Sequence, residues 1–269
     1  MPVVSPTYRL SDDQFRRIAD LLPPNRRRGG QWKDHRLMID GILWALSDGG
    51  RWRNVPADFG PWQSVYDRFR RWTRRGLWDK ILRRLQARRM NAGDIDFSLF
   101  CIDGTVVRGH QSAAGAAATR PPGEPADHAL GRSQGGFGTK PHLICDGAGT
   151  PLAAAVGPGQ EHETQRAIPL LEEAAAWPQP PAKVAGDKGY SAGWLRDWLR
   201  EQGIQPVIAH RRNETRPARF PRKVYRRRNV IERCVGSLKW FRRVATRYEK
   251  LATHYLAMVT IAIIFRLLS

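Results

Sequence analysis

The spacing of apolar residues changes near residue 96 of this 269-residue chain, and that change limits the possible folds more than any other feature. Before it, residues 10–89 place apolar side chains three and four positions apart, which is typical of amphipathic helices. After it, the apolar residues come in short runs of strand length. These runs are residues 97–102, 140–145, 151–156 and 183–186.

Helical spacing returns between the later strand runs, at residues 164–177 and 191–202. Strands that alternate with helices in this way favour a mixed α/β domain built on one sheet. We therefore predict two domains, a helical one over residues 1–92 and an α/β one over residues 93–269. A chain of this length is also longer than most single domains.

The helical part carries basic residues between its apolar positions. Ser11 is placed to cap a first helix, a second is expected from Lys33 to Ser47, and a third from Trp62 to about Thr73. The third has an apolar stripe and exposed cations that include Arg68 and Arg71. This resembles a helix-turn-helix unit that contacts DNA, although any small basic helical bundle would have the same pattern.

Residues 109–138 fit neither helix nor strand, because they are rich in glycine, alanine and proline. We predict a long, flexible loop there. Its Gly135-Gly136-Phe137-Gly138 sequence is not a phosphate-binding loop, since the required Gly-Lys-Ser/Thr order is absent.

The charge balance predicts a polyanionic partner. The chain has 45 Lys and Arg residues against 25 Asp and Glu residues, a formal net charge of +20. The cations recur in several clusters and are not confined to one amphipathic helix, which favours double-stranded DNA over a membrane surface. The basic run from Arg211 to Arg228 is interpreted as a DNA clamp or as a solvated loop.

Three cysteines without a paired spacing indicate neither a disulfide framework nor a zinc site, and we interpret Cys101, Cys145 and Cys234 as small core residues of a cytoplasmic protein. No export signal is evident at the N-terminus. The apolar stretch from Tyr255 to Leu268 is too short to span a membrane and predicts a buried helix.

Two aspartates follow apolar runs at places where the backbone is expected to turn. Asp103 follows Leu99-Phe100-Cys101-Ile102, and Asp187 follows Val184-Ala185-Gly186. Acids at the ends of buried strands are common ion ligands, and they also cap turns without any further role. Glycines beside both residues allow a ligand to approach closely.

A third acid lies on a helix predicted from Val224 to Val244, where no strong helix breaker occurs. At about 100° per residue, Tyr225, Arg228, Glu232 and Lys239 fall within an arc of about 60°. One helix face therefore presents a tyrosine, an acid and two cations. The plain alternative for Glu232 is an ordinary salt bridge with Arg228 at i and i+4.

The spacing Tyr225-x2-Arg228-x3-Glu232-x6-Lys239 resembles the signature of DDE insertion-sequence transposases of the insertion-sequence five group. The segments Cys101 to Thr105 and Gly186 to Tyr190 resemble the two other acidic motifs of that group, and Asp58 to Trp72 is similar to its leading segment. The resemblance therefore covers nearly the whole chain.

The resemblance implies a ribonuclease H-like catalytic domain, with Asp103 bridging two Mg²⁺ ions that Asp187 and Glu232 also hold. Mn²⁺ is expected to substitute. It further implies DNA contacts from Tyr225, Arg228, Arg227 and Lys239, and it makes His162 and His110 candidates for supporting roles. A homodimer or larger assembly on two DNA ends is expected. Two alternatives stay open, namely a DNA-binding regulator without catalysis, and a ribonuclease H-type nuclease or resolvase without strand transfer.

Overall fold

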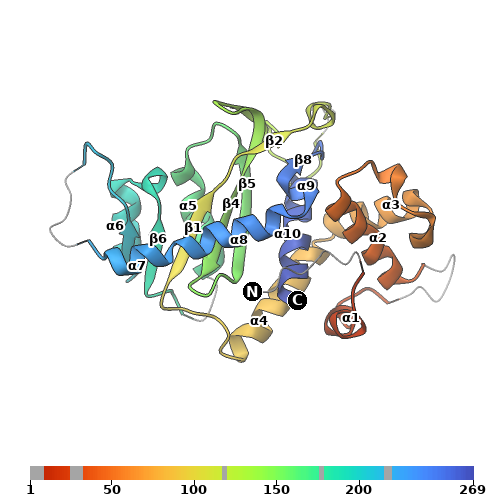
Figure 1. Ribbon diagram of the computed structural model, residues 1–269, viewed down its shortest axis with the longest axis horizontal. Coiled ribbons are helices and arrows are strands. Elements are labelled where there is room, and N and C mark those ends of the chain that lie inside the picture. Colours follow the sequence, from red (N-terminus) through yellow and green to blue (C-terminus); the bar gives the residue numbers. More distant parts are fainter. Residues whose placement is uncertain (1–8, 25–32, 117–119, 176–178, 215–219) are drawn as a thin grey trace.

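The computed structural model describes residues 9–24, 33–116, 120–175, 179–214 and 220–269. A central sheet has helices on both faces, and a group of N-terminal helices lies at one end (Figure 1). The helices are α1 (Asp12–Ala19), α2 (His35–Asp48), α3 (Trp62–Arg74), α4 (Leu77–Asn91), α5 (Ala167–Ala175), α6 (Gly193–Glu201), α7 (Arg222–Arg227), α8 (Asn229–Lys239), α9 (Arg242–Ala245) and α10 (Ala252–Leu268). The strands are β1 (Phe100–Gly104), β2 (Val107–Gly109), β3 (Gly131–Ser133), β4 (Gly136–Asp146), β5 (Pro151–Pro158), β6 (Lys183–Gly186), β7 (Gln205–Ile208) and β8 (Thr246–Arg247).

The α/β part is built on one sheet, as predicted, and this sheet contains both parallel and antiparallel pairs. β4 pairs antiparallel with β1 on one side and with β5 on the other. β6 then pairs parallel with β1, and β7 pairs parallel with β6. This sheet brings the ends of β1 and β6 side by side, because the two strands are parallel neighbours.

The two faces of the sheet bury different sets of side chains, because successive residues of a strand point to opposite faces. On β1, Cys101 faces α8 and α10, whereas Phe100 and Ile102 face α5 and α6. Cys145 and Cys234 join Cys101 in the first of these cores. All three cysteines are buried and free, which confirms their prediction as core residues.

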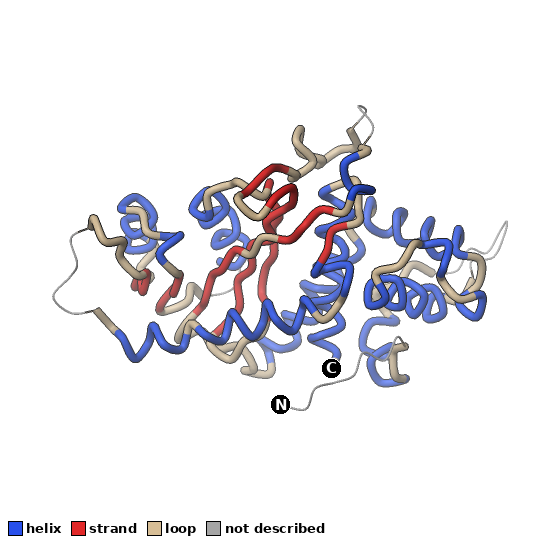
Figure 2. Tube along the Cα trace, turned by 45° about the horizontal axis from the view of Figure 1, so that its top comes forward, coloured by secondary structure: helices blue, strands red, loops and turns tan. Residues whose placement is uncertain are grey.

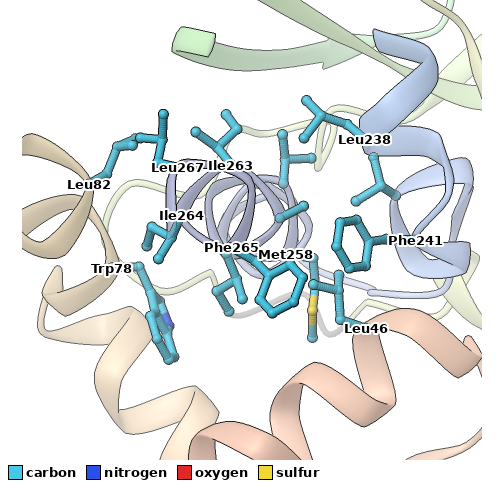
Figure 3. Close-up of a cluster of buried hydrophobic side chains, with 14 of the residues drawn as sticks. Leu46, Trp78, Leu82, Leu238, Phe241, Met258, Ile263, Ile264, Phe265 and Leu267 are labelled. Atoms are coloured by element: carbon cyan, nitrogen blue, oxygen red, sulfur yellow. The ribbon is translucent and has the colours of Figure 1, made fainter. Parts of the chain in front are cut away.

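Helix α10 lies at the centre of the core that contains Cys101, which is the larger of the two. It packs against α2, α3 and α4 on one side and against β5 and α8 on the other. Figure 3 shows its side chains meeting Leu46 of α2, Trp78 of α4 and Leu238 of α8. The predicted buried helix at Tyr255 to Leu268 is therefore confirmed, and none of the described helices is long and apolar enough to cross a membrane.

The N-terminal helices begin where their capping residues predict. Ser11 forms a capping box with Gln14 at the start of α1, and Asp34 caps α2. The connection between α2 and α3 runs from Gly49 to Pro61 and contains two short 3₁₀ turns. Since a helix-turn-helix unit uses a turn of about three or four residues, this helical region departs from the predicted motif in its connection.

The helix predicted from Val224 to Val244 is interrupted. α7 ends at Arg227, α8 continues in nearly the same direction to Lys239, and α9 forms a separate turn after Phe241. In Figure 2 the rod formed by α7 and α8 runs along the sheet. The interruption at Phe241 has a packing cause, because this side chain is buried against Phe265 of α10.

The segment predicted as a loop at 109–138 contains ordered strands. β3 and the first residues of β4 form a hairpin within it. The buried Arg247 donates to the carbonyl oxygens of His128 and Ala129, and the Glu124 carboxylate accepts from the backbone N–H groups that begin α10. The loop prediction was wrong for residues 131–133 and 136–138, which form this hairpin. Residues 120–130 contain neither helix nor strand, but partners over a hundred positions away hold them. Residues 117–119 fall outside the described part of the chain.

Candidate active site

Asp103 lies within β1, one residue before its end, on the face that α8 covers. The side chains of Cys101 and Asp103 share this face, because they are two residues apart. The backbone of β1 is held on both sides, by β4 over its whole length and by β6 at Phe100 and Cys101. A strand paired on both sides fixes the Asp103 carboxylate in place.

Asp187 follows the last residue of β6 and starts a 3₁₀ turn. Its Oδ1 atom accepts a hydrogen bond of 2.8 Å from the backbone N–H of Gly189. The turn-capping role considered for this residue is therefore present. Because β6 is the parallel neighbour of β1, the capped carboxylate stands beside Asp103 at the same edge of the sheet.

Helix α8 brings the third acid to this edge. Arg228, where α7 meets α8, donates to Glu232 at 2.5 Å, and its guanidinium carbon lies 5.8 Å from the ring centre of Tyr225. The predicted face thus exists, and the Glu232 side chain is 53% exposed. The salt bridge considered as the alternative is also present, so the side chain of Glu232 is turned toward its own helix.

Lys239 lies at the end of α8, where it contacts the connection between β1 and β2. Its Nζ atom donates a hydrogen bond of 2.6 Å to Oγ1 of Thr105. Asp103 raises the pKa of Lys239, but the larger effect is burial, which lowers it. The lysine therefore stands close to the acids without an ion pair to them.

The electrostatics of Asp103 link the three acids. The pKa of this carboxyl is raised to about 6, mainly by burial; the charges of Asp187 and Glu232 contribute to the rise, and Arg228 opposes it. The three acids come from β1, the end of β6 and α8, and each of the other two acts on Asp103. The site therefore concentrates negative charge at a partly buried point.

A fourth carboxylate, which the sequence interpretation did not select, joins this group. A Cβ atom placed on Gly189 would lie 1.7 Å from Oε2 of Glu163 and 3.0 Å from Oδ1 of Asp187. Burial raises the pKa of Glu163, and the neighbouring charges of Asp187 and Asp103 add to this. Lys140 lies on the other side, with 3.7 Å between its Nζ and Oε1 of Glu163.

Only a weak signal for Glu163 is present in the sequence. Glu163 adjoins the candidate His162, but without a fold nothing distinguishes it from Glu161 two residues earlier. Glu161 forms an ion pair with Arg166 instead, and it lies 3.5 Å from Nε2 of His142, a buried imidazole whose pKa is lowered by burial.

The two candidate histidines occupy different places. His162 caps the short turn before α5 through Thr164, and its Nε2 lies 2.9 Å from an Arg211 nitrogen. It directly precedes Glu163, the fourth carboxylate of the site. His110 stacks against Tyr248 beyond β2, where it lines a separate groove. The structure therefore brings His162 toward the acids and leaves His110 elsewhere.

The cations predicted to contact DNA differ in their surroundings. Arg68 is buried, and its guanidinium contacts His35 and the carbonyl oxygen of Lys33, so its prediction as an exposed DNA contact is wrong. Arg227 is exposed but donates to Asp96 at 2.6 Å. Arg71 is half-buried on α3. Part of the predicted clamp, residues 215–219, lies outside the described residues.

The donor set fits hard divalent cations, because carboxylate oxygens are the ligands that Mg²⁺ and Mn²⁺ prefer. The raised pKa of Asp103 also marks an excess of negative charge that a cation would relieve. Among the described residues, however, no three acids, histidines or cysteines already stand close enough to hold an ion. Glu232 must leave Arg228 to complete the site.

Comparisons with known proteins agree over both parts of the chain. Residues 10–82 match a family described as "Putative transposase of IS4/5 family", and residues 95–267 match the family "Transposase DDE domain".

Individual relatives match shorter stretches. A putative transposase for insertion sequence element IS402 of Burkholderia cepacia is 35% identical over 43% of this chain and 56% of its own length. A putative transposase for element IS6501 of Brucella ovis is 29% identical over 46% of this chain and 93% of its own length. An uncharacterized protein of Sinorhizobium fredii, y4sN, is 38% identical over 40% of this chain and 82% of its own length.

Among solved structures, the Mos1 transposase paired-end complex with left transposon end matches with a TM-score of 0.28 and 13% identity, over 79% of this chain and 82% of that one. The DDE match covers more than half of the sequence and includes all three acids. The chain therefore belongs to the family of transposases with a DDE domain.

Proposed function

We propose that this protein cuts DNA at the ends of an insertion sequence and joins those ends to target DNA, with Asp103, Asp187 and Glu232 as its catalytic acids. The observation that carries the proposal is the electrostatic coupling of Asp103 to both other acids, although the three belong to separate elements. Membership of the DDE family supports the same assignment.

In this proposal the acids hold two Mg²⁺ ions, which supply charge stabilisation for the attacking and leaving oxygens. Asp103, whose carboxyl is influenced by the charges of both other acids, would hold the ions together with Asp187 and Glu232. Asp187 is held by its turn, and the Glu232 carboxylate would have to leave Arg228 to take part. Arg228 then becomes free to contact a DNA phosphate.

The reaction has two displacements at phosphorus. In the first, water attacks a phosphodiester, the bond to the 3′ oxygen breaks, and that oxygen leaves as a 3′-hydroxyl after gaining a proton. In the second, this hydroxyl attacks a phosphodiester of the target, loses its proton, and displaces the target's own 3′ oxygen. Each step exchanges one phosphorus–oxygen bond for another.

Other residues of the site position DNA. Lys239 is placed to exchange Thr105 for a phosphate oxygen close to Asp103. Tyr225 offers a ring beside Arg228 on the same face. The helical N-terminal domain, proposed to span residues 1–92, would contact the terminal inverted repeats. Because two ends must be processed together, we propose a homodimer or larger assembly on double-stranded DNA.

Two other functions make different predictions. A DNA-binding regulator would bind the ends without cutting them in Mg²⁺. A nuclease or resolvase of ribonuclease H type would cut without transferring a strand. The arrangement of carboxylates favours metal-dependent cleavage over a regulator without catalysis. Membership of the DDE transposase family favours strand transfer over cutting alone.

The test incubates the protein with Mg²⁺ or Mn²⁺, labelled DNA carrying the element's terminal repeats, and a supercoiled target plasmid. We expect cut ends and plasmid joined to labelled DNA from wild type, and neither from Glu232→Gln. Glu172→Gln, which alters an exposed acid of α5, is the matched control and should retain both products. Normal cutting by Glu232→Gln would overturn the assignment.

A further inference from the structure

A groove of about 1400 Å³ lies between the N-terminal helices and the far end of the sheet. One wall is formed by residues 49–54 and by α3. The other wall is formed by residues 110–116, after β2, and by residues 248–251, before α10. Its volume exceeds the roughly 300–1,000 Å³ of a typical small-molecule site. The groove therefore suits an extended ligand.

Aromatic side chains line this groove along much of its length. Trp62 and Tyr66 come from α3, Trp52 from the connection before it, and Tyr248 from the opposite wall. All four are only partly buried, so part of each ring remains accessible. Rings from both walls thus face one channel.

Arginines accompany these rings. The guanidinium carbon of Arg53 lies 5.9 Å from the ring centre of Trp62, and that of Arg70 lies 5.6 Å from Tyr66. Arg51 and Lys250 are exposed at the groove and add positive charge from opposite walls. Trp62 and Tyr66 therefore each have an arginine beside the ring that can contact an adjoining anion.

The acid and the histidine at the groove's floor do not oppose this charge. Glu249 is buried and paired with the equally buried Arg243. Burial and nearby arginines lower the pKa of His254 to about 4, so it is neutral at pH 7. The exposed charge of the groove is consequently positive.

Alternating rings and cations match one ligand chemistry, that of single-stranded nucleic acid. Unpaired bases stack on aromatic rings without sequence preference, while phosphates contact the neighbouring cations. The stacked bases of a duplex would not reach the rings. We propose that this groove binds a single-stranded stretch of DNA, and that in the proposed function this stretch adjoins the cut end.

The groove is connected to the acids through β1 and β2. From Asp103 to His110 the chain spans at most about 23 Å, at about 3.3 Å per residue. At about 3.4 Å per nucleotide along one strand, this corresponds to about seven nucleotides. The unpaired stretch should therefore lie within about seven nucleotides of the scissile bond.

The test measures binding without catalysis. Wild-type protein in EDTA is titrated into a fluorescein-labelled 15-nucleotide oligothymidine and, separately, into a 15-base-pair duplex, with fluorescence anisotropy as the readout. We expect Trp62→Ala to weaken oligothymidine binding about tenfold, in line with the loss of one stacking contact. Duplex binding should change less than twofold.

The chain offers matched controls on α6, away from the groove. Trp194 is 51% exposed, so Trp194→Ala removes an exposed indole of the same kind. Arg200→Ala is the control for Arg51→Ala, because both arginines are exposed. We expect Arg51→Ala to weaken oligothymidine binding severalfold and both α6 variants to bind as wild type does. Trp62→Phe, which keeps a ring and serves if the alanine variant fails to fold, should retain most of the affinity.

Equal losses of oligothymidine and duplex binding in Trp62→Ala would overturn the proposal, because they would indicate a purely electrostatic surface. Unchanged oligothymidine binding in both Trp62→Ala and Arg51→Ala would overturn it as well. Because Mg²⁺ is absent, either failure leaves the assignment of the catalytic acids untouched. Conversely, a wild-type protein that binds oligothymidine but never cuts DNA would refute the proposed function alone.

Discussion

The acid site has a strand side, formed by Asp103 and Asp187, and a helix side, formed by Glu232 on α8, and the two sides are built differently. Asp103 is held by a strand paired on both sides, is partly buried, and has a pKa raised to about 6. Glu232 is half exposed on α8 and already has a cation, because Arg228 donates to it. The negative charge of Asp103 is therefore unfavourable in the folded protein, whereas the charge of Glu232 is offset by Arg228.

This difference indicates how the site would respond to a divalent cation. The strand side is positioned in advance and would gain most from binding, because its charge is insufficiently compensated. The helix side must exchange Arg228 for the cation, and in this pair the Glu232 side chain is 53% exposed whereas that of Arg228 is 15% exposed. Glu232 is therefore the carboxylate that can turn away, and α8 is the adaptable half.

The largest effect is expected from Asp103→Asn. Loss of the central acid removes charge stabilisation worth several kcal/mol, so cutting of terminal-repeat DNA in Mg²⁺ should fall at least about a thousandfold. Single-turnover cleavage of labelled DNA measures this. Cutting within tenfold of wild type would place the central acid elsewhere.

The same substitution should stabilise the metal-free protein. The pKa of Asp103 is raised to about 6 in the folded state, so ionising this carboxyl destabilises the folded protein. Below about pH 4 the carboxyl is protonated in both states and costs no stability, whereas stability falls as the pH rises through about 6. At pH 8, the free energy of unfolding of Asp103→Asn should exceed that of wild type by about 2–3 kcal/mol. Urea denaturation in EDTA at pH 4.5 and pH 8 provides the measurement, and an equal gain at both values would contradict the account.

Arg228→Met sharpens the comparison from the helix side. Arg228 is the largest favourable influence on ionised Asp103, so its loss should raise the pKa of Asp103 above about 6. The pH at which metal-free stability declines should move upward accordingly. Arg233→Met, which alters an exposed arginine of the same helix, should leave it in place. A downward movement in Arg228→Met would contradict the assigned charge coupling.

Glu163→Gln should change the pKa of Asp103 least, and in the direction opposite to Arg228→Met. It removes a negative charge near Asp103 and Asp187, so the pKa of Asp103 should fall slightly. The decline in metal-free stability should then occur at a slightly lower pH. An unchanged or higher midpoint would show that Lys140 already neutralises Glu163.

Local rules in the sequence predicted much of this molecule. The capping box at Ser11, the buried helix at Tyr255 to Leu268 and the face shared by Arg228 and Glu232 follow from neighbouring residues. These features depend on interactions only three or four positions apart, or on the apolar character of one segment.

Features that depend on distant partners were missed. Glu163 joins the acids through the fold, and Arg68 is buried through contacts with residues over thirty positions away. The segment at 109–138 owes its order to β4, Arg247 and the start of α10. Composition alone indicated a loop there, because glycine and proline say nothing about such partners.

The central claim is that Asp103, Asp187 and Glu232 form one divalent-cation site whose strand side dominates. The most direct test is the thermal unfolding midpoint of DNA-free protein as Mn²⁺ is added. At about a hundred times the dissociation constant, binding should stabilise wild type by about 2.7 kcal/mol. We predict the same rise in the exposed control Asp197→Asn, a smaller rise in Glu232→Gln, and none in Asp103→Asn or Asp187→Asn. A full rise in Asp103→Asn would contradict the account.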